Sequence, residues 1–251
     1  MGNSAARDFG VQSYCFRHFK DNAQVAELVK KIGVNTIEVC AVHADFGDVA
    51  GWKDIVQIYR DAGVGIVSIG VQTFTGAAVE RQWFECAAAA GAQHISAHFR
   101  VDSFATVVPA TAKLCEEYGI KIGIHCHGGY MFGGSPDVLS HLLAIGGPNI
   151  GVCIDTAWCM QIGPRQGNPV QWVEQFKERV HGVHFKDFTF DRNATWHDVV
   201  VGTGNLDLPA FVQALEANNF SGMAVIEYEA DVENPVPALT ECVNKMRSLA
   251  G

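Results

Sequence analysis

The sequence predicts an α/β protein that folds as a single (β/α)₈ TIM barrel over residues 1–251. The chain has 251 residues, close to the roughly 250 that one such barrel needs. Short apolar, β-branched runs alternate with helical patterns along the whole chain, as expected for βα units. Neither a G-x-G-x-x-G fingerprint nor a G-x-x-x-x-G-K-[ST] loop follows a strand, which disfavours an open nucleotide-binding sheet. No linker or low-complexity segment suggests a second domain.

The elements can be placed in order along the chain. Strands are expected at 9–15, 36–42, 65–71, 94–99, 121–125, 150–155, 180–186 and 223–228. The helices between them are expected at 21–32, 52–62, 78–90, 104–118, 136–145, 169–179, 208–218 and 237–249. Glycines close five of these helices, at Gly33, Gly63, Gly91, Gly119 and Gly146.

Composition restricts the class of function. Hydrophobic residues make up 48% of the chain and charged residues 18%, with a formal net charge of −9 and no basic run. Nucleic acid and anionic membrane surfaces are therefore poor partners, and no apolar run approaches the ~18 residues of a membrane span. The eight cysteines form no C-x-x-C pair, which favours reduced, buried thiols and a cytoplasmic location. A monomer and a homo-oligomer both stay open.

Strand parity predicts which polar side chains share the barrel interior, because alternate residues of a strand face opposite sides. In 150–155 the bulky aliphatic residues share one parity, which leaves Asp155 pointing inward at the strand end. The same reasoning directs a further set of polar side chains into the barrel: Glu38, Ser96, His98, His125, His127, His184, Lys186, Glu227 and Glu229.

Several ionisable groups inside one barrel mouth need compensation, which a cation would supply. A strand-end histidine (His125 or His127), Asp155, His184 and Glu227 come from four consecutive strands and would meet at the face where barrel enzymes place their chemistry. Singly, each is more often a hydrogen-bonded structural residue. Together they predict one divalent metal ion, with Mn²⁺ or Zn²⁺ favoured and Co²⁺, Fe²⁺ and Mg²⁺ as alternatives.

Four motifs then resemble one family along nearly the whole chain: IGVCIDTAW (150–158), VHGVHFKD (180–187), VGTGNLDLPAFVQAL (201–215) and VIEYE (225–229). They are similar to the sugar phosphate isomerase/epimerase superfamily of xylose isomerase-like barrels, which includes tagatose and psicose epimerases, inosose dehydratase and endonuclease IV. The resemblance implies a metal site at His125, Asp155, His184 and Glu227. Endonuclease IV is the poor match, because its larger histidine-rich metal set and basic DNA face are missing.

Two departures from the family pattern concern the chemistry. His125 stands where a Glu is usual, and Trp158 stands where the Asp-Thr-Gly-His pattern has its His. In the epimerases the carboxylates ending strands five and eight are viewed as the acid/base pair, so a different proton carrier is needed. His125, His127, Lys186 and Glu38 are the candidates beside Glu227.

The resemblance implies an isomerase or epimerase acting on a sugar, keto-sugar or cyclitol. Glu227 or a nearby histidine would remove a proton next to a carbonyl, and Lys186 would help to neutralise the enediolate. If a substituent leaves from that intermediate, the enzyme is a dehydratase or lyase. A non-catalytic sugar-binding or partner subunit is the third hypothesis. Substrate identity would depend on loops 17–21, 74–77, 128–135 and 158–168.

Overall fold

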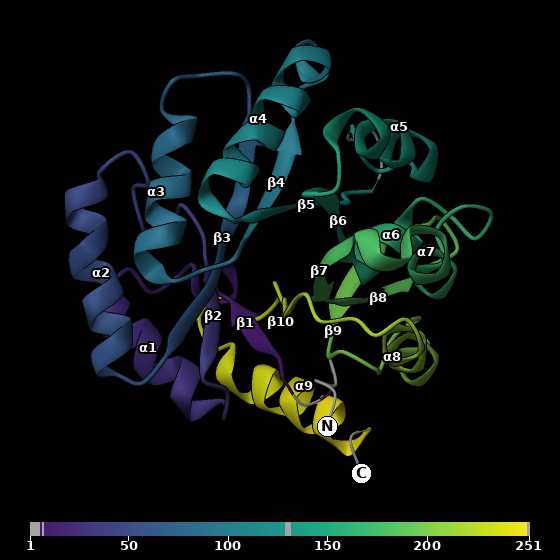
Figure 1. Cartoon of the computed structure of the whole chain (residues 1–251). Helices are drawn as coiled ribbons and strands as arrows, with labels where there is room; N and C mark the ends of the chain where they lie inside the picture. Colours follow the sequence, from purple (N-terminus) through teal and green to yellow (C-terminus); the bar gives the residue numbers. More distant parts are fainter. Residues whose placement is uncertain (1–5, 7, 129–131, 250–251) are drawn as a thin grey trace.

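The computed structural model describes residue 6 and residues 8–128 and 132–249. Eight parallel strands close into a barrel, with the neighbours in the order β1-β2-β3-β4-β5-β6-β7-β10, so the predicted TIM barrel is confirmed. Figure 1 shows the helices arranged around the ring of strands. Part of the glycine-rich loop expected at 128–135, namely 129–131, lies outside the described residues.

The barrel strands are β1 (Gly10–Gln12), β2 (Thr36–Val39), β3 (Gly65–Phe74), β4 (His94–Phe99), β5 (Lys121–His125), β6 (Ile150–Asp155), β7 (Val180–Phe185) and β10 (Met223–Ile226). The helices are α1 (Asn22–Lys31), α2 (Val49–Asp61), α3 (Glu80–Ala90), α4 (Phe104–Tyr118), α5 (Pro136–Gly146), α6 (Thr156–Gln161), α7 (Pro169–Phe176), α8 (Leu208–Ala217) and α9 (Val236–Ser248). Two short 3₁₀ segments, Ser13–Phe16 and Lys177–Arg179, follow β1 and α7.

Side-chain caps and glycine turns set the ends of several helices. Asp21 accepts a hydrogen bond from the Ala23 N–H and begins α1, and Asp207 does the same for the Ala210 N–H at α8. Gly119 ends α4 in a left-handed conformation (φ 67°), which glycine adopts without a steric penalty. These local signals keep the connections short and direct the strand ends toward a common rim.

The two faces of the strands bury different residues. Ile150, Val152 and Ile154 of β6 belong to the large core between strands and helices. Cys153, on the opposite parity, packs with Met223 and Val225 in a smaller cluster. The parity expected for β6 is therefore observed, and Asp155, at the end of β6, is fully buried.

An imidazole occupies the barrel interior where two strands carry glycine. A Cβ atom added at Gly123 would lie 2.4 Å from Nε2 of His94, and one added at Gly182 would lie 2.9 Å from it. Nδ1 of His94 lies 3.0 Å from Oγ of Ser68, at hydrogen-bonding distance. The two glycines thus make room for a polar ring beneath the strand ends.

A hairpin interrupts the βα alternation after β7, in a segment for which the sequence pattern predicts neither a strand nor a helix. Strands β8 (Asp187–Phe190) and β9 (Trp196–Val199) pair antiparallel with each other, outside the barrel. The buried Asp187 carboxylate accepts hydrogen bonds from the N–H groups of Gly202, Gly204 and Leu206 at 2.8–3.0 Å. These contacts hold the segment after the hairpin against the start of β8, which gives the VGTGNLD segment (201–207) a structural role.

The cysteines and the apolarity of the helices complete the description of the fold. All eight cysteines are free and buried, as expected for reduced thiols. Among the described helices, none combines the length and apolarity that crossing a membrane requires.

Candidate metal centre

Four buried side chains converge at the carboxyl ends of the barrel strands. His125 ends β5, Asp155 ends β6, His184 lies near the end of β7, and Glu227 directly follows β10. Their candidate ligand atoms all lie within 4.8 Å of one another. These are the four residues that the sequence motifs bring together, and a cluster of this kind can hold one metal ion.

The unpaired atoms in this cluster fit a cation. Nδ1 and Nε2 of His125 and Oδ2 of Asp155 are buried and have no hydrogen-bond partner among the described residues, although Nε2 and Oδ2 lie 3.5 Å apart. Oδ1 of Asp155 accepts a hydrogen bond from the Trp158 N–H at 2.8 Å and caps α6. One carboxylate oxygen is therefore used by the fold, and the other is free to bind a cation.

Burial controls the protonation of these two groups. Desolvation, with the nearby His184, lowers the pKa of His125 to about 3, so its imidazole is neutral at pH 7 and keeps a lone pair for a metal. Desolvation raises the pKa of Asp155 to about 6, although the Lys186 charge opposes the rise. An added cation would favour the ionised carboxylate.

His184 lies between two carboxylates. Its Nδ1 is 2.9 Å from Oε2 of Glu227 and its Nε2 is 2.9 Å from Oε1 of Glu38. Burial alone would lower the pKa of His184, but the neighbouring Cys153, the Glu38 charge and the hydrogen bond to Glu227 raise it. The pKa of Glu227 is lowered despite burial, chiefly by Lys186 and His184. The pair is thus held close, with Glu227 ionised at neutral pH.

Glu38 reaches the centre only through His184. Its side chain is fully buried, Gln12 and Ser68 donate hydrogen bonds to it at 2.5 Å, and Ser96 donates another at 2.5 Å. His184 lowers the pKa of Glu38 to about 2 against the effect of burial. With this many donors around it, Glu38 is placed to orient His184 rather than to meet a substrate.

Lys186 supplies a fixed positive charge at the same mouth. Its side chain is 1% exposed, and Nζ pairs with Glu229 and lies 3.6 Å from Oδ2 of Asp198. Burial would lower its pKa, but Glu227 and Asp155 raise it. The ammonium group therefore stays charged at neutral pH, which makes it a stabiliser of anions and a poor base.

Aromatic rings form one wall of the mouth. The His127 ring stacks on Trp158 with centroids 4.0 Å apart and an interplanar angle of 23°. Trp158 in turn meets Phe188 at 5.0 Å and Trp196 at 5.3 Å, both edge-on. His127 thus lies between this wall and the ring of His125, 6.2 Å away.

Four of the five predicted catalytic candidates lie at this mouth, and the fifth, Glu38, lies behind His184; the four are His125, His127, Lys186 and Glu227. Sequence reasoning missed the partners Gln12 and Ser68 and the wall residues of the hairpin. The alternation of Phe188, Phe190, Trp196 and Asp198 in two short runs around a polar turn was the available signal for that hairpin.

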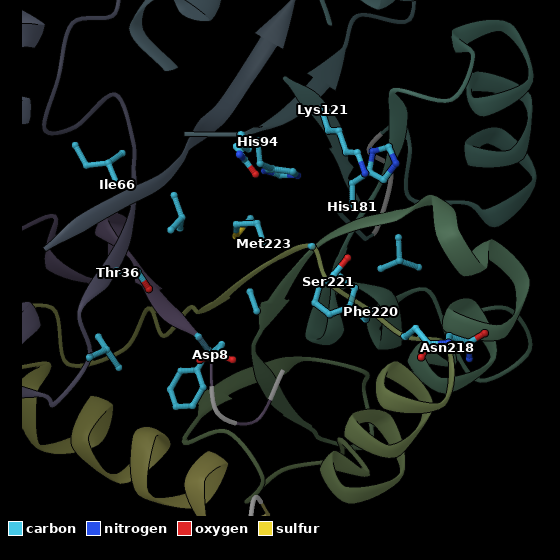
Figure 2. A pocket seen from close by; sticks show the side chains of 18 of the residues that line it. Asp8, Thr36, Ile66, His94, Lys121, His181, Asn218, Phe220, Ser221 and Met223 are labelled. Carbon is cyan, nitrogen blue, oxygen red and sulfur yellow. The ribbon is translucent and has the colours of Figure 1, made fainter. Parts of the chain in front are cut away.

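A larger cavity lies at the other end of the barrel. It has a volume of about 850 Å³ and is lined by residues that begin strands, among them Thr36, His94 and Lys121. Figure 2 shows these side chains with His181 and Met223 around the opening. No predicted site residue lines this cavity, so its size does not identify the reacting end.

Comparison with known proteins agrees with this geometry. The family model of xylose isomerase-like TIM barrels matches residues 26–249. A 3-oxo-isoapionate decarboxylase of Pectobacterium atrosepticum is 30% identical over 118 residues, which cover 45% of this chain and 41% of that protein. The chain thus matches about two fifths of the length of that curated relative.

Two solved structures share the fold. A D-allulose 3-epimerase from Methylomonas sp. superposes with a TM-score of 0.73 at 16% identity, covering 96% of this chain and 97% of that chain. The IolI protein, whose structure holds a zinc atom, superposes with a TM-score of 0.71 at 14% identity, covering 95% and 97%. At these identities the likeness concerns the fold alone.

Proposed function

Because this chain belongs to the family of xylose isomerase-like TIM barrels, we propose that it is a metal-dependent isomerase or epimerase of a small sugar, keto-sugar or cyclitol. One observation carries the proposal: the buried cluster of His125, Asp155, His184 and Glu227, with its unpaired ligand atoms. The D-allulose 3-epimerase that shares the fold and the similar 3-oxo-isoapionate decarboxylase support the substrate class.

The donor set supports a particular choice of ion. Two imidazoles and two carboxylates carry a formal charge of −2, which one divalent ion neutralises. Imidazole ligands favour Zn²⁺ and related transition metals, whereas Mg²⁺ prefers an all-oxygen set. We propose Zn²⁺ or Mn²⁺, and the zinc in the IolI structure supports the first.

Each residue at the mouth then has a role. A divalent ion held there would polarise the substrate carbonyl and acidify the neighbouring C–H. Glu227, ionised at neutral pH, accepts that proton, and the Lys186 ammonium stabilises the negative charge that develops on oxygen. His127, on the opposite wall beside Trp158, is the group placed to return a proton. Glu38 holds His184 in position.

One observation favours a second candidate, an enolate-forming lyase such as a dehydratase or decarboxylase. His125 replaces the second carboxylate of the epimerase pattern, and with a pKa of about 3 it is a poor proton donor at neutral pH. In a dehydratase the enolate formed by proton removal would expel a neighbouring hydroxyl as water. In a decarboxylase the same enolate would form when the C–C bond to a carboxylate next to the carbonyl-bearing carbon breaks and CO₂ leaves. The similarity to a decarboxylase over 118 residues supports this alternative.

The test has two stages. Elemental mass spectrometry of the purified protein should find close to one transition metal per chain, and Asp155→Ala and His184→Ala should lose it, whereas the exposed cap variant Asp207→Asn should keep it. Proton NMR in D₂O should then show solvent deuterium entering a keto-sugar or cyclitol from a panel of D-fructose, D-tagatose and scyllo-inosose. A new product without deuterium exchange in the substrate would favour the lyase. Protein that cannot take up Zn²⁺ or Mn²⁺ would refute both enzymes.

A further inference from the structure

A groove next to the candidate metal centre shares Lys186 with it, but its hairpin side chains have no part in the roles assigned above. Its volume is about 370 Å³, within the roughly 300–1,000 Å³ of small-molecule pockets. Six side chains define this hairpin groove: Trp158, Lys186, Phe188, Trp196, Asp198 and Glu229. Figure 1 shows where the β8–β9 hairpin, which supplies three of them, lies beside β7 and α6.

Trp196 supplies the exposed aromatic surface of the hairpin groove, and the buried Phe188 supports it from behind. Phe188 and Trp196 are nearly parallel, with an interplanar angle of 28° and centroids 6.3 Å apart. Trp196 is 43% exposed, one of the few large hydrophobic residues on the described surface. Rigid aromatic faces of this kind stack well against other rings with an apolar face, such as the C–H face of a pyranose.

The polar side of the groove has an unmet hydrogen bond. Oδ2 of Asp198 accepts from the Glu229 N–H at 3.2 Å, but the buried Oδ1 has no partner among the described residues. A buried carboxylate oxygen without a donor is costly, and a ligand hydroxyl would satisfy it. The groove therefore combines stacking surfaces with a hydroxyl acceptor, which together are suited to a sugar ring.

The groove lies next to the metal centre, because Lys186 lines the groove and acts on two of the candidate ligands. The Lys186 ammonium lies 6.0 Å from the Trp158 ring centroid, and its charge also acts on Glu227 and Asp155. Trp158 lines the groove while His127 covers one of its faces. A ligand in the groove would therefore lie beside the candidate ligands of the metal.

We propose that the hairpin groove binds a second sugar ring, so that the substrate is a glycoside of a keto-sugar rather than a free monosaccharide. This inference rests on the proposed function only for the position of the first ring, whose carbonyl end lies at the metal centre. The second ring stacks on the tryptophans and donates a hydroxyl hydrogen bond to Asp198.

Tryptophan emission of the metal-loaded protein, titrated with D-fructose and with turanose, maltulose and palatinose, tests the proposal. The three disaccharides join a glucose ring to the same keto-sugar through different linkages. At least one should bind about three- to tenfold more tightly than D-fructose. Trp196→Ala should bring that ratio to about one, and Trp196→Phe, which keeps an aromatic face, should retain most of it.

Trp83→Phe is the matched control, because Trp83 packs against Phe74 in the helix layer away from the groove. It should reduce emission without changing the ratio. Equal dissociation constants for all four sugars, a ratio unaffected by Trp196→Ala, or emission that no sugar changes would overturn the proposal. Deuterium exchange in D₂O, followed separately, reports on the proposed function: tighter disaccharide binding without exchange in any sugar would support the groove and refute the isomerase.

Discussion

Replacing Asp155 with Asn should have opposite effects on the metal-free and metal-loaded protein. The amide oxygen of Asn can keep the cap on the Trp158 N–H, so α6 is preserved. The substitution removes the buried negative charge of Asp155. In the metal-free protein Oδ2 has no hydrogen-bond partner, and in the metal-loaded protein the carboxylate would be a ligand. We therefore expect Asp155→Asn to melt above wild type in EDTA and below it in saturating Zn²⁺ or Mn²⁺.

The magnitude follows from the pKa of Asp155. A rise from 3.8 to about 6 corresponds to about 3 kcal/mol of destabilisation once the carboxyl is ionised. An unpaired amide in its place costs about 1 kcal/mol, which leaves a net gain of about 2 kcal/mol. For a chain of this size that gain raises Tm by about 4–8 °C. Metal at 100 times its Kd stabilises wild type by about 2.7 kcal/mol and should leave the variant nearly unchanged.

The pH dependence has a definite sign. Because the folded pKa of Asp155 is raised, folded protein binds more protons than unfolded protein between pH 4 and 6, and this group lowers stability as pH rises through that window. Scanning calorimetry in EDTA should therefore find a higher Tm for Asp155→Asn than for wild type at pH 7.5. This difference in Tm should disappear near pH 4. The control Asp207→Asn removes a charge from an exposed cap and should show no such crossover. If Asp155→Asn melts below wild type in EDTA at pH 7.5, the buried charge of Asp155 does not destabilise the metal-free protein, and the prediction is wrong.

Three further variants test single contacts. Glu38→Gln, which removes the charge beside Nε2 of His184, should reduce metal affinity about 10–100-fold by competition with a chelator; unchanged affinity would refute a positioning role. It should also lower Tm at neutral pH, because the lowered pKa of Glu38 means that its ionised form stabilises the folded protein. Lys186→Gln should lower kcat by about 10²–10³-fold while elemental analysis still finds the metal, and a loss of metal would instead make Lys186 a structural group. Asp187→Ala removes the acceptor of three backbone hydrogen bonds and should destabilise the protein by about 2–4 kcal/mol in urea unfolding, whereas Asp191→Ala, in the exposed hairpin turn, should cost under 1 kcal/mol.

Sequence patterns located the barrel strands well where apolar alternation was bounded by turn residues. The expected strands 94–99, 121–125 and 150–155 and the helix 104–118 coincide with β4, β5, β6 and α4. Helix α6 was missed because its six residues are too few to show helical periodicity directly after a strand. The first expected strand, 9–15, is longer than β1, because the chain enters a 3₁₀ segment at Ser13.

The candidate site could be assembled from strand parity, because every ligand lies at or next to a strand end where alternation fixes its direction. Parity does not report depth, so the sequence could not distinguish the enclosed Glu38 from the more accessible Glu227. Nor could it place His127 on Trp158, since that stack joins the loop after β5 to helix α6. Contacts between segments that no pattern links emerge only in three dimensions.

The β8–β9 hairpin hydrogen-bonds as a separate two-stranded sheet, and the Asp187 contacts fix its base. An insertion or deletion in its turn would leave the strand number and stagger of the closed barrel unaltered. Proteins that evolve from this chain could therefore change the length or the side chains of the hairpin in small steps, while the candidate metal ligands kept their positions. The hairpin side of the mouth can therefore change in sequence without changing the barrel. A segment exchanged between relatives from Asp187 to Gly204 would be a natural unit of recombination.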